Sequence, residues 1–294
     1  MKHQVALLLC LCLLLAGVAR AADWTTTDLG QTAIVPMKSA PYPHDSRKDG
    51  FKKGEKVYPA EKHYSDSSVL LFIPKGYKTG EKTDVLVYFH GHNNNVAAAV
   101  EKFRLREQVV ASKKNVILIF PEGPKDVPDS GLGKLEDKDG LKNLLAESLQ
   151  VLKADDKIPA ANLGHVVLTG HSGAYYGIAM CLKHGGVEDN LSEVYLLDAA
   201  YGNIGEYSGW LIRNKTGRFC SIYTDHLKAR NEGIMAALKE KAVAYESTMD
   251  TEADDSFLKS HRIVFLHTTT LTHDNTVTLL EKFLRTGPLP DRPS

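Results

Sequence analysis

Residues 165–182, HVVLTGHSGAYYGIAMCL, constrain the fold more than any other part of this chain. An apolar run at 166–168 leads into a turn, and a helical pattern of small and apolar residues follows it. This order predicts a strand, a sharp turn and a helix. Ser172 stands at the turn, with Gly170 two residues before it and Ala174 two residues after it. Larger side chains on either side would collide with the neighbouring strands, so the serine hydroxyl is expected to project from the end of the sheet.

Apolar segments with strand composition alternate with helical patterns along most of the chain. The helix that follows 115–120 illustrates the pattern, because its apolar residues recur at the spacing of a helix lying on a sheet. The sequence predicts further strands at 68–74, 84–89, 115–120, 193–198, 218–224 and 262–268, and helices at 96–111, 141–152, 227–245 and 277–284. This alternation predicts an α/β fold, with a mostly parallel central sheet covered by helices on both faces.

The first 21 residues differ from the rest of the chain. Lys2 precedes an apolar run at 5–18, and Ala19, Arg20 and Ala21 follow it. This is the pattern of a secretory signal peptide that is cleaved after Ala21. The run is too short for a spanning helix, so we expect a secreted or periplasmic protein without a stable membrane anchor.

The sequence therefore predicts three segments: a signal peptide at 1–21, an N-terminal surface extension at 22–66, and one α/β domain at 67–294. The chain has 36 basic and 36 acidic side chains, and loss of the signal peptide removes only Lys2 and Arg20, leaving 34 basic side chains. Near-neutral charge argues against a nucleic-acid partner. Cys181 and Cys220 remain after cleavage, either as a disulfide or as two buried thiols.

The strand, the turn around Ser172 and the following helix resemble the nucleophile elbow of the α/β-hydrolase superfamily, with Ala174 in place of the last glycine of its G-x-S-x-G motif. The resemblance covers roughly residues 68–284. It implies the α/β-hydrolase fold, no cofactor, and an exported serine hydrolase that cleaves a carboxylic ester through an acyl-enzyme on Ser172. Its substrate would be a small-molecule or polymeric acyl compound. Two alternatives are an exported peptidase or amidase, and a catalytically silent binding protein on the same fold.

In this superfamily the catalytic residues follow in the order serine, acid, histidine. The resemblance assigns the base to His273, in the loop after the last strand, although His267 within that strand competes with it. Asp198 ends an apolar strand and is similar to the strand-end aspartate of pancreatic-type lipases, whereas Asp225 ends the next strand, the commoner position of the acid. We favour Asp198, because a buried aspartate needs a partner to offset its desolvation, and keep Asp225 as the alternative.

The oxyanion hole of the superfamily uses backbone N–H groups, which here would belong to His92 and Gly173. His90 and His92 also allow a metal site, but side chains two apart on a strand point to opposite faces, and no carboxylate or cysteine cluster accompanies them. We therefore expect no metal site. Aromatic residues on segments near the cleft either bind an apolar or sugar-like substrate or simply pack: Tyr175, Tyr176, Tyr201, Tyr207 and Trp210.

Overall fold

The computed structural model describes residues 21–293. The predicted signal peptide at 1–21 therefore lies outside the described residues, apart from Ala21. Within 21–293, no helix combines the length and the apolar character needed to cross a membrane.

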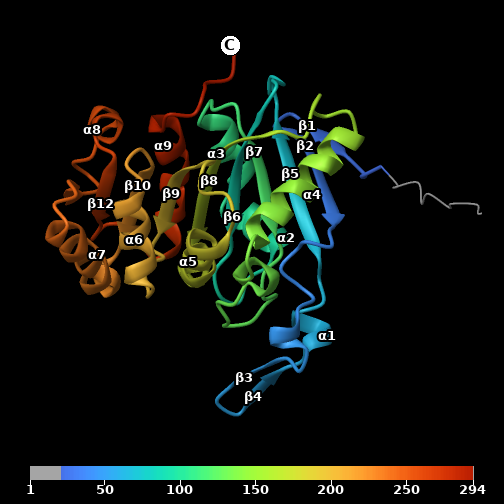
Figure 1. Ribbon diagram of the computed structural model, residues 1–294, viewed down its shortest axis with the longest axis horizontal. Coiled ribbons are helices and arrows are strands. Elements are labelled where there is room, and N and C mark those ends of the chain that lie inside the picture. The colour runs from blue at the N-terminus through green and yellow to red at the C-terminus, as the bar shows by residue number, and fades with distance from the viewer. Residues whose placement is uncertain (1–20, 294) are drawn as a thin grey trace, which may run out of the picture.

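One large sheet organises the molecule (Figure 1). Its strands follow the order β1-β2-β5-β7-β6-β8-β9-β10-β12-β11, and neighbours from β7 to β11 pair parallel. At the other edge, β5, β2 and β1 add antiparallel pairs. The strand bounds are β1 Thr25–Thr27, β2 Gly30–Pro36, β5 Ser68–Pro74, β6 Thr83–Phe89, β7 Ile117–Pro121, β8 Leu163–His171, β9 Leu191–Leu197, β10 Arg218–Tyr223, β11 Glu246–Met249 and β12 Ile263–His267. A separate hairpin of β3 (Phe51–Lys53) and β4 (Lys56–Tyr58) projects from the body.

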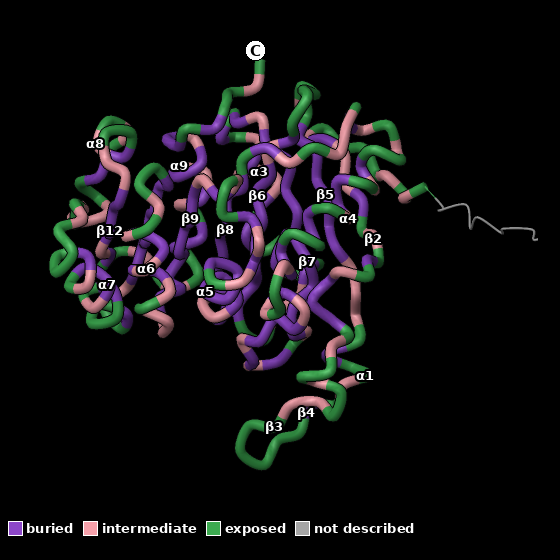
Figure 2. The backbone as a smooth tube through the Cα atoms, viewed as in Figure 1, coloured by how far each residue is buried: buried purple, intermediate pink, exposed green. Residues whose placement is uncertain are grey.

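Helices cover both faces of this sheet, as the sequence predicts. The core on one face is built with α4, α5, α6 and α7, and the core on the other with α2, α3, α8 and α9. Their bounds are α2 Val96–Lys102, α3 Leu105–Ala111, α4 Gly140–Ala154, α5 Tyr175–His184, α6 Ile204–Arg213, α7 Lys228–Glu240, α8 Asp255–Ser260 and α9 Leu279–Thr286, and a short α1 spans Ala60–His63. Figure 2 shows the central strands buried and the β3–β4 hairpin largely exposed.

All the predicted strands are present, but the helices differ in detail. The predicted helix at 96–111 is two helices, because the chain turns at Arg104, whose φ of 49° is incompatible with a continuous helix. The predicted helix at 277–284 begins as the 3₁₀ turn η5 (Asp274–Thr278) before α9. Several elements were not predicted from the sequence, among them the short helix α8, the helix α6, which contains two glycines, and the edge strand β11, whose sequence ESTM is too polar to resemble a core strand.

The segment at 22–66 contributes to the sheet and also to the surface. Its β1 and β2 form the outer strands at one edge, while α1 and the β3–β4 hairpin lie outside the sheet. Cys181 and Cys220 are both buried and unbridged. They belong to the cores on opposite faces of the sheet, so the disulfide alternative does not fit this fold.

Candidate active site

Ser172 lies at a tight turn between β8 and α5. Its φ of 56° places it in the left-handed region, so the chain reverses sharply and begins the 3₁₀ turn η3 (Ser172–Ala174). Ala174 has a φ of −64°, which any residue adopts. A Cβ at Gly170 would lie 2.5 Å from the Cβ of Ala174, so the absence of a side chain at Gly170 provides the space for the methyl group of Ala174. The missing final glycine of the motif is therefore compatible with the turn.

Asp198 and His273 are hydrogen-bonded to each other. Asp198 directly follows β9 and has no exposed surface, and its Oδ2 accepts a hydrogen bond from Nδ1 of His273 at 2.6 Å. His273 lies between β12 and η5, and its side chain is 35% exposed. Thr224, which follows β10, donates to the same carboxylate through its N–H and its hydroxyl, both at 2.9 Å. The ends of three parallel strands thus meet at one carboxylate.

The electrostatics of Asp198 favour its ionised form. Burial alone would raise the pKa of this carboxyl group, but the hydrogen bonds from His273 and Thr224 outweigh that effect and lower the pKa below its usual value. An ionised Asp198 only accepts hydrogen bonds. The proton on His273 is consequently held at Nδ1, and Nε2 is left free to accept another proton.

Asp225 forms a separate pair. Its Oδ1 lies 2.7 Å from Nε2 of His267, and its side chain is 78% exposed. The imidazole of His267 stacks on Tyr223, with ring centres 5.3 Å apart and an angle of 16° between the planes. The two candidate acids are therefore paired with two different histidines, and Asp198 is the one that contacts His273.

A chain of hydrogen bonds leads away from Asp198 to Tyr201. Because Thr224 donates its hydroxyl proton to the carboxylate, Oγ1 of Thr224 accepts from Nδ1 of His226 at 2.6 Å. In the neutral ring, Nε2 of His226 then accepts from the hydroxyl of Tyr201 at 2.8 Å. The sequence analysis did not single out Thr224 or His226. The only sequence feature that could have indicated them is their position just after β10, the strand next to β9.

His171, the residue before Ser172, links the elbow to the loop that carries His273. The two imidazole centres are 4.4 Å apart, and Nε2 of His171 donates to the backbone carbonyl of His273 at 3.1 Å. Burial, with the neighbouring His273, lowers the pKa of His171 to about 4, so the ring is neutral at neutral pH. His171 was not singled out from the sequence, although its contacts hold the loop of His273 beside the turn that carries Ser172.

The loop after β6 lies against the elbow. A Cβ at Gly91 would be 2.7 Å from the Cβ of Ser172, and a Cβ at Gly173 would be 2.3 Å from Cδ2 of His92. Nε2 of His92 lies 2.7 Å from the hydroxyl of Ser130. The backbone of this loop therefore packs directly on the turn that carries Ser172.

The segment at 22–66 reaches the loops of the candidate active site through Asp129. The guanidinium of Arg47 donates to both carboxylate oxygens of Asp129, at 2.6 and 3.0 Å, and the hydroxyl of Tyr64 donates at 3.0 Å. Asp129 precedes Ser130, the partner of His92. These contacts tie the N-terminal segment to the loop that supports His92.

The two histidines of the HGH sequence have different partners. Nε2 of His90 lies 3.0 Å from the carboxylate of Glu122, which also accepts the N–H of Val96 at the start of α2. His92 instead contacts Ser130. Within the described part of the chain, the potential ligand atoms that converge belong to another group: Asp198, His226 and His273.

The aromatic residues named from the sequence divide into two sets. Tyr207 and Trp210 lie on the buried face of α6, and the hydroxyl of Tyr207 donates to the carbonyl of Tyr175. Tyr175, Tyr176 and Tyr201 are half-buried, and Tyr175 and Tyr201 have ring centres 5.8 Å apart. Tyr201 also lies edge-on to His273 at 6.3 Å. The second set borders the candidate active site, and the first belongs to the core.

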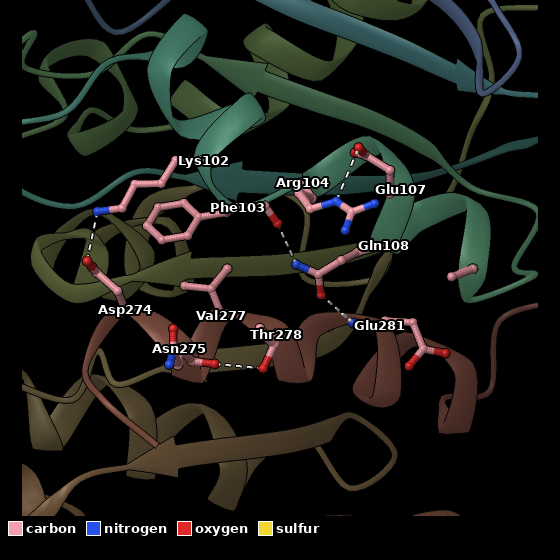
Figure 3. Close-up of a pocket in the computed structure, with 11 residues that line it drawn as sticks. Lys102, Phe103, Arg104, Glu107, Gln108, Asp274, Asn275, Val277, Thr278 and Glu281 are labelled. Atoms are coloured by element: carbon pink, nitrogen blue, oxygen red, sulfur yellow. Dashed lines mark hydrogen bonds and ion pairs between the residues drawn. The ribbon is translucent and has the colours of Figure 1, made fainter. Parts of the chain in front are cut away.

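A groove of about 330 Å³ lies beside the loop of His273, between α2–α3 and η5–α9 (Figure 3). Lys102 and Asp274 form an ion pair of 2.8 Å at one end of it. Gln108 joins its two walls, donating to the carbonyl of Phe103 and accepting the N–H of Glu281. Neither Ser172 nor His273 lines this groove, so it is separate from the candidate active site.

No family model matches the sequence, and the search of curated proteins gave no significant match. The fold is similar to that of solved esterases. A feruloyl esterase module from Clostridium thermocellum, complexed with sinapinate, aligns with a TM-score of 0.55 and 11% identity over 90% of this chain and 94% of that one. An S-formylglutathione hydrolase from Agrobacterium tumefaciens aligns with a TM-score of 0.50 and 11% identity over 90% and 96%. A ferulic acid esterase aligns at 0.50 and 13% over 74% and 91%. This chain therefore has the α/β-hydrolase fold.

Proposed function

We propose that this protein is a serine hydrolase that cleaves carboxylic esters through an acyl-enzyme on Ser172. The observation that carries the proposal is the hydrogen bond between the buried carboxylate of Asp198 and Nδ1 of the half-open His273. It is supported by the left-handed turn at Ser172 and by the packing of His171 against His273. An imidazole oriented in this way leaves Nε2 available as a general base.

In the proposed mechanism, Nε2 of His273 takes the proton of Ser172 as Oγ attacks the ester carbonyl. Asp198 stabilises the resulting imidazolium by accepting its Nδ1–H. The backbone N–H groups of His92 and Gly173 would donate to the oxyanion. His273 then returns the proton to the leaving alcohol, and a water molecule, activated by the same nitrogen, hydrolyses the acyl-enzyme.

We also propose that aromatic acyl groups are among the substrates. Tyr201 lies beside His273 and Tyr175 packs against Tyr201, so two aromatic rings lie next to the proposed base, where they could pack against an aromatic acyl group. The feruloyl esterase of similar fold was solved with sinapinate, an aromatic acid. Methyl ferulate therefore belongs in the test panel beside short alkyl esters.

The test is hydrolysis of short-chain p-nitrophenyl esters and methyl ferulate by the purified protein and by Ser172→Ala. The proposal predicts that the substitution reduces kcat/KM by at least about 10⁴-fold, since the nucleophile is lost. Ser256→Ala, at an exposed position on α8, is the control and should keep full activity. A protein that hydrolyses none of these esters, or a Ser172→Ala variant that remains active, would overturn the proposal.

We further propose that the protein is exported and that residues 1–21 are removed on the way. The apolar run and the small residues before position 22 support this proposal. N-terminal sequencing of protein recovered from outside the cytoplasm should begin at Ala22. A chain recovered there that still starts at Met1 would contradict it.

A further inference from the structure

We propose that Asp198, His226 and His273 form a binding site for a divalent transition-metal ion of the zinc type, and that the bound ion switches the hydrolase off. Metal binding stands on the geometry alone, whereas inhibition rests on the proposed function. The three side chains lie in the segments that follow β9, β10 and β12, and their potential ligand atoms lie within 4.8 Å of one another.

Two of the three separations between the ligand atoms, those from Asp198, are close to the separation in a tetrahedral site, and the third is no more than 4.8 Å. Zinc binds imidazole nitrogen and carboxylate oxygen at about 2.0 to 2.2 Å, which separates neighbouring ligand atoms by about 3.3 Å. Here Oδ2 of Asp198 lies 2.6 Å from Nδ1 of His273 and 3.9 Å from Nε2 of His226. To bind the ion, the distance from Asp198 to His273 must lengthen and the distance from Asp198 to His226 must shorten, each by less than an ångström.

The side chains that must move are the ones with freedom to do so. His226 is 47% exposed and His273 is 35% exposed, while Asp198 is fully buried and fixed by Thr224. The ion therefore reaches the carboxylate from solvent, between the two imidazoles. Two histidines and one carboxylate leave a fourth position for water, as in many zinc sites.

Neighbouring contacts support this assignment of ligand atoms. Nδ1 of His226 donates to Thr224, which keeps Nε2 unprotonated and available to a metal. The hydroxyl of Tyr201 occupies that nitrogen at 2.8 Å and must release it. Tyr201 thus competes with the ion for His226.

The inhibition follows from the tautomer of His273. In the resting tautomer, Nδ1 of His273 carries the proton. A metal ion that binds Nδ1 displaces this proton, which moves to Nε2. Nε2 is the atom that must accept the proton of Ser172. The bound ion also neutralises the charge of Asp198 that would stabilise the imidazolium. No bond to Ser172 is needed for inactivation.

The experiment is calorimetric titration of Zn²⁺ into tag-free Ser172→Ala protein, which reports binding without reference to hydrolysis. We expect one site, weakened at least about tenfold by adding His226→Ala, because a direct ligand contributes at least as much as an outer partner. His165→Ala is the matched control: it removes an exposed histidine paired with Asp84 at the far end of β8, and binding should not change. Tyr201→Phe should bind at least as tightly as the parent.

Inhibition is measured as the ratio of esterase activity with and without Zn²⁺, each variant serving as its own reference. The parent should be inhibited and reactivated by EDTA, and His226→Ala should resist inhibition at the same Zn²⁺ concentration. Zn²⁺ affinity that is unchanged in His226→Ala, or weakened in Tyr201→Phe, overturns the site. Binding without any effect on an active esterase overturns the inhibition and leaves the proposed function standing.

Discussion

The two ends of β9 each carry a buried carboxylate, and the two have different surroundings. Glu193 lies near the start of the strand and Asp198 directly follows its end, and neither has exposed surface. Glu193 lies 3.2 Å from the guanidinium of Arg218, which also donates to the carbonyl of Phe283 and to the hydroxyl of Thr286. This cluster joins β9 and β10 to α9 and is closed to solvent. Asp198 instead contacts an imidazole that is partly open.

The hydrogen bonds around each carboxyl group explain the contrast. Burial raises the pKa of Glu193, although Arg218 opposes the shift, and Oε1 of Glu193 has no hydrogen-bond partner among the described residues. At Asp198 the hydrogen bonds outweigh burial, and the pKa is lowered. Burial with incomplete hydrogen bonding is compatible with a structural role. A fully hydrogen-bonded carboxylate beside an accessible base is what acid–base chemistry requires.

The largest effect of a substitution is expected at Asp198, the carboxylate at the partly exposed end of β9. Asp198→Asn should lower kcat/KM by about 10³- to 10⁴-fold with little loss of folded protein, because the amide favours the wrong tautomer of His273. Asp225→Asn, the matched substitution at the surface pair, should change kcat/KM by no more than a few-fold. Steady-state ester hydrolysis measures both. Equal losses in the two variants would erase the distinction between the acids.

The next largest effect of a substitution is expected at the buried cluster of Glu193 and Arg218, at the other end of β9. Arg218→Met should lower the free energy of unfolding by about 3 to 5 kcal/mol, because it leaves Glu193 buried without its partner. Urea unfolding measures this, with Arg230→Met on the exposed face of α7 as the control. Adding Glu193→Gln should recover part of the loss. Reduced activity per folded molecule in Arg218→Met would show that the two ends of β9 are coupled.

His171 is a buried titratable group near Asp198, so it tests how burial acts at this end of β9. Its pKa is about 4 in the folded protein against 6.5 for a free histidine, so the unfolded chain takes up a proton first as the pH falls. The stability that His171 contributes is complete above pH 6.5 and is lost as the pH falls toward 4. Between pH 7 and 5 the loss is about 2 kcal/mol.

His171→Gln keeps a donor for the carbonyl of His273 but does not titrate. Urea unfolding at pH 7 and at pH 5 should show a smaller decrease in stability for this variant than for the parent, whatever its absolute stability. Identical decreases would mean that His171 is not held neutral by its surroundings.

The smallest effect is expected at the groove in Figure 3. Lys102 and Asp274 are each about half exposed, at 51% and 50%, so their ion pair is well solvated. Lys102→Ala should lower the free energy of unfolding by no more than about 0.5 kcal/mol and leave ester hydrolysis nearly unchanged. A large fall in kcat would show that this ion pair positions the neighbouring His273.

Much of the fold was predictable because its strands are continuous apolar runs bounded by turns. Among the elements that were not predicted, β11 and α6 lack that pattern: β11 is polar at a sheet edge, and α6 contains glycines. The break at Arg104 was not predictable either, since a left-handed residue leaves the apolar spacing on either side intact.

At the candidate site, the resemblance to the α/β-hydrolase superfamily singled out Ser172 and His273 but left two acids open. Asp198 and Asp225 end adjacent strands, and the direction in which each side chain points depends on the backbone after the strand. Asp198 has a φ of 48°, a left-handed conformation that composition does not reveal. The contacts of Thr224, His226 and His171 with the site were not predictable either, because they form only where neighbouring strands end side by side in the folded sheet.

Covalent labelling with a fluorophosphonate tests the central claim most directly, because an activated serine reacts with the reagent far faster than an ordinary hydroxyl group does. We expect one phosphonyl group per chain, mapped by peptide mass spectrometry to Ser172. Labelling should be absent in Ser172→Ala, strongly slowed in Asp198→Asn and unaffected in Asp225→Asn. An unlabelled parent protein, or a label on any other residue, would contradict the assignment of Ser172, His273 and Asp198 to one catalytic unit.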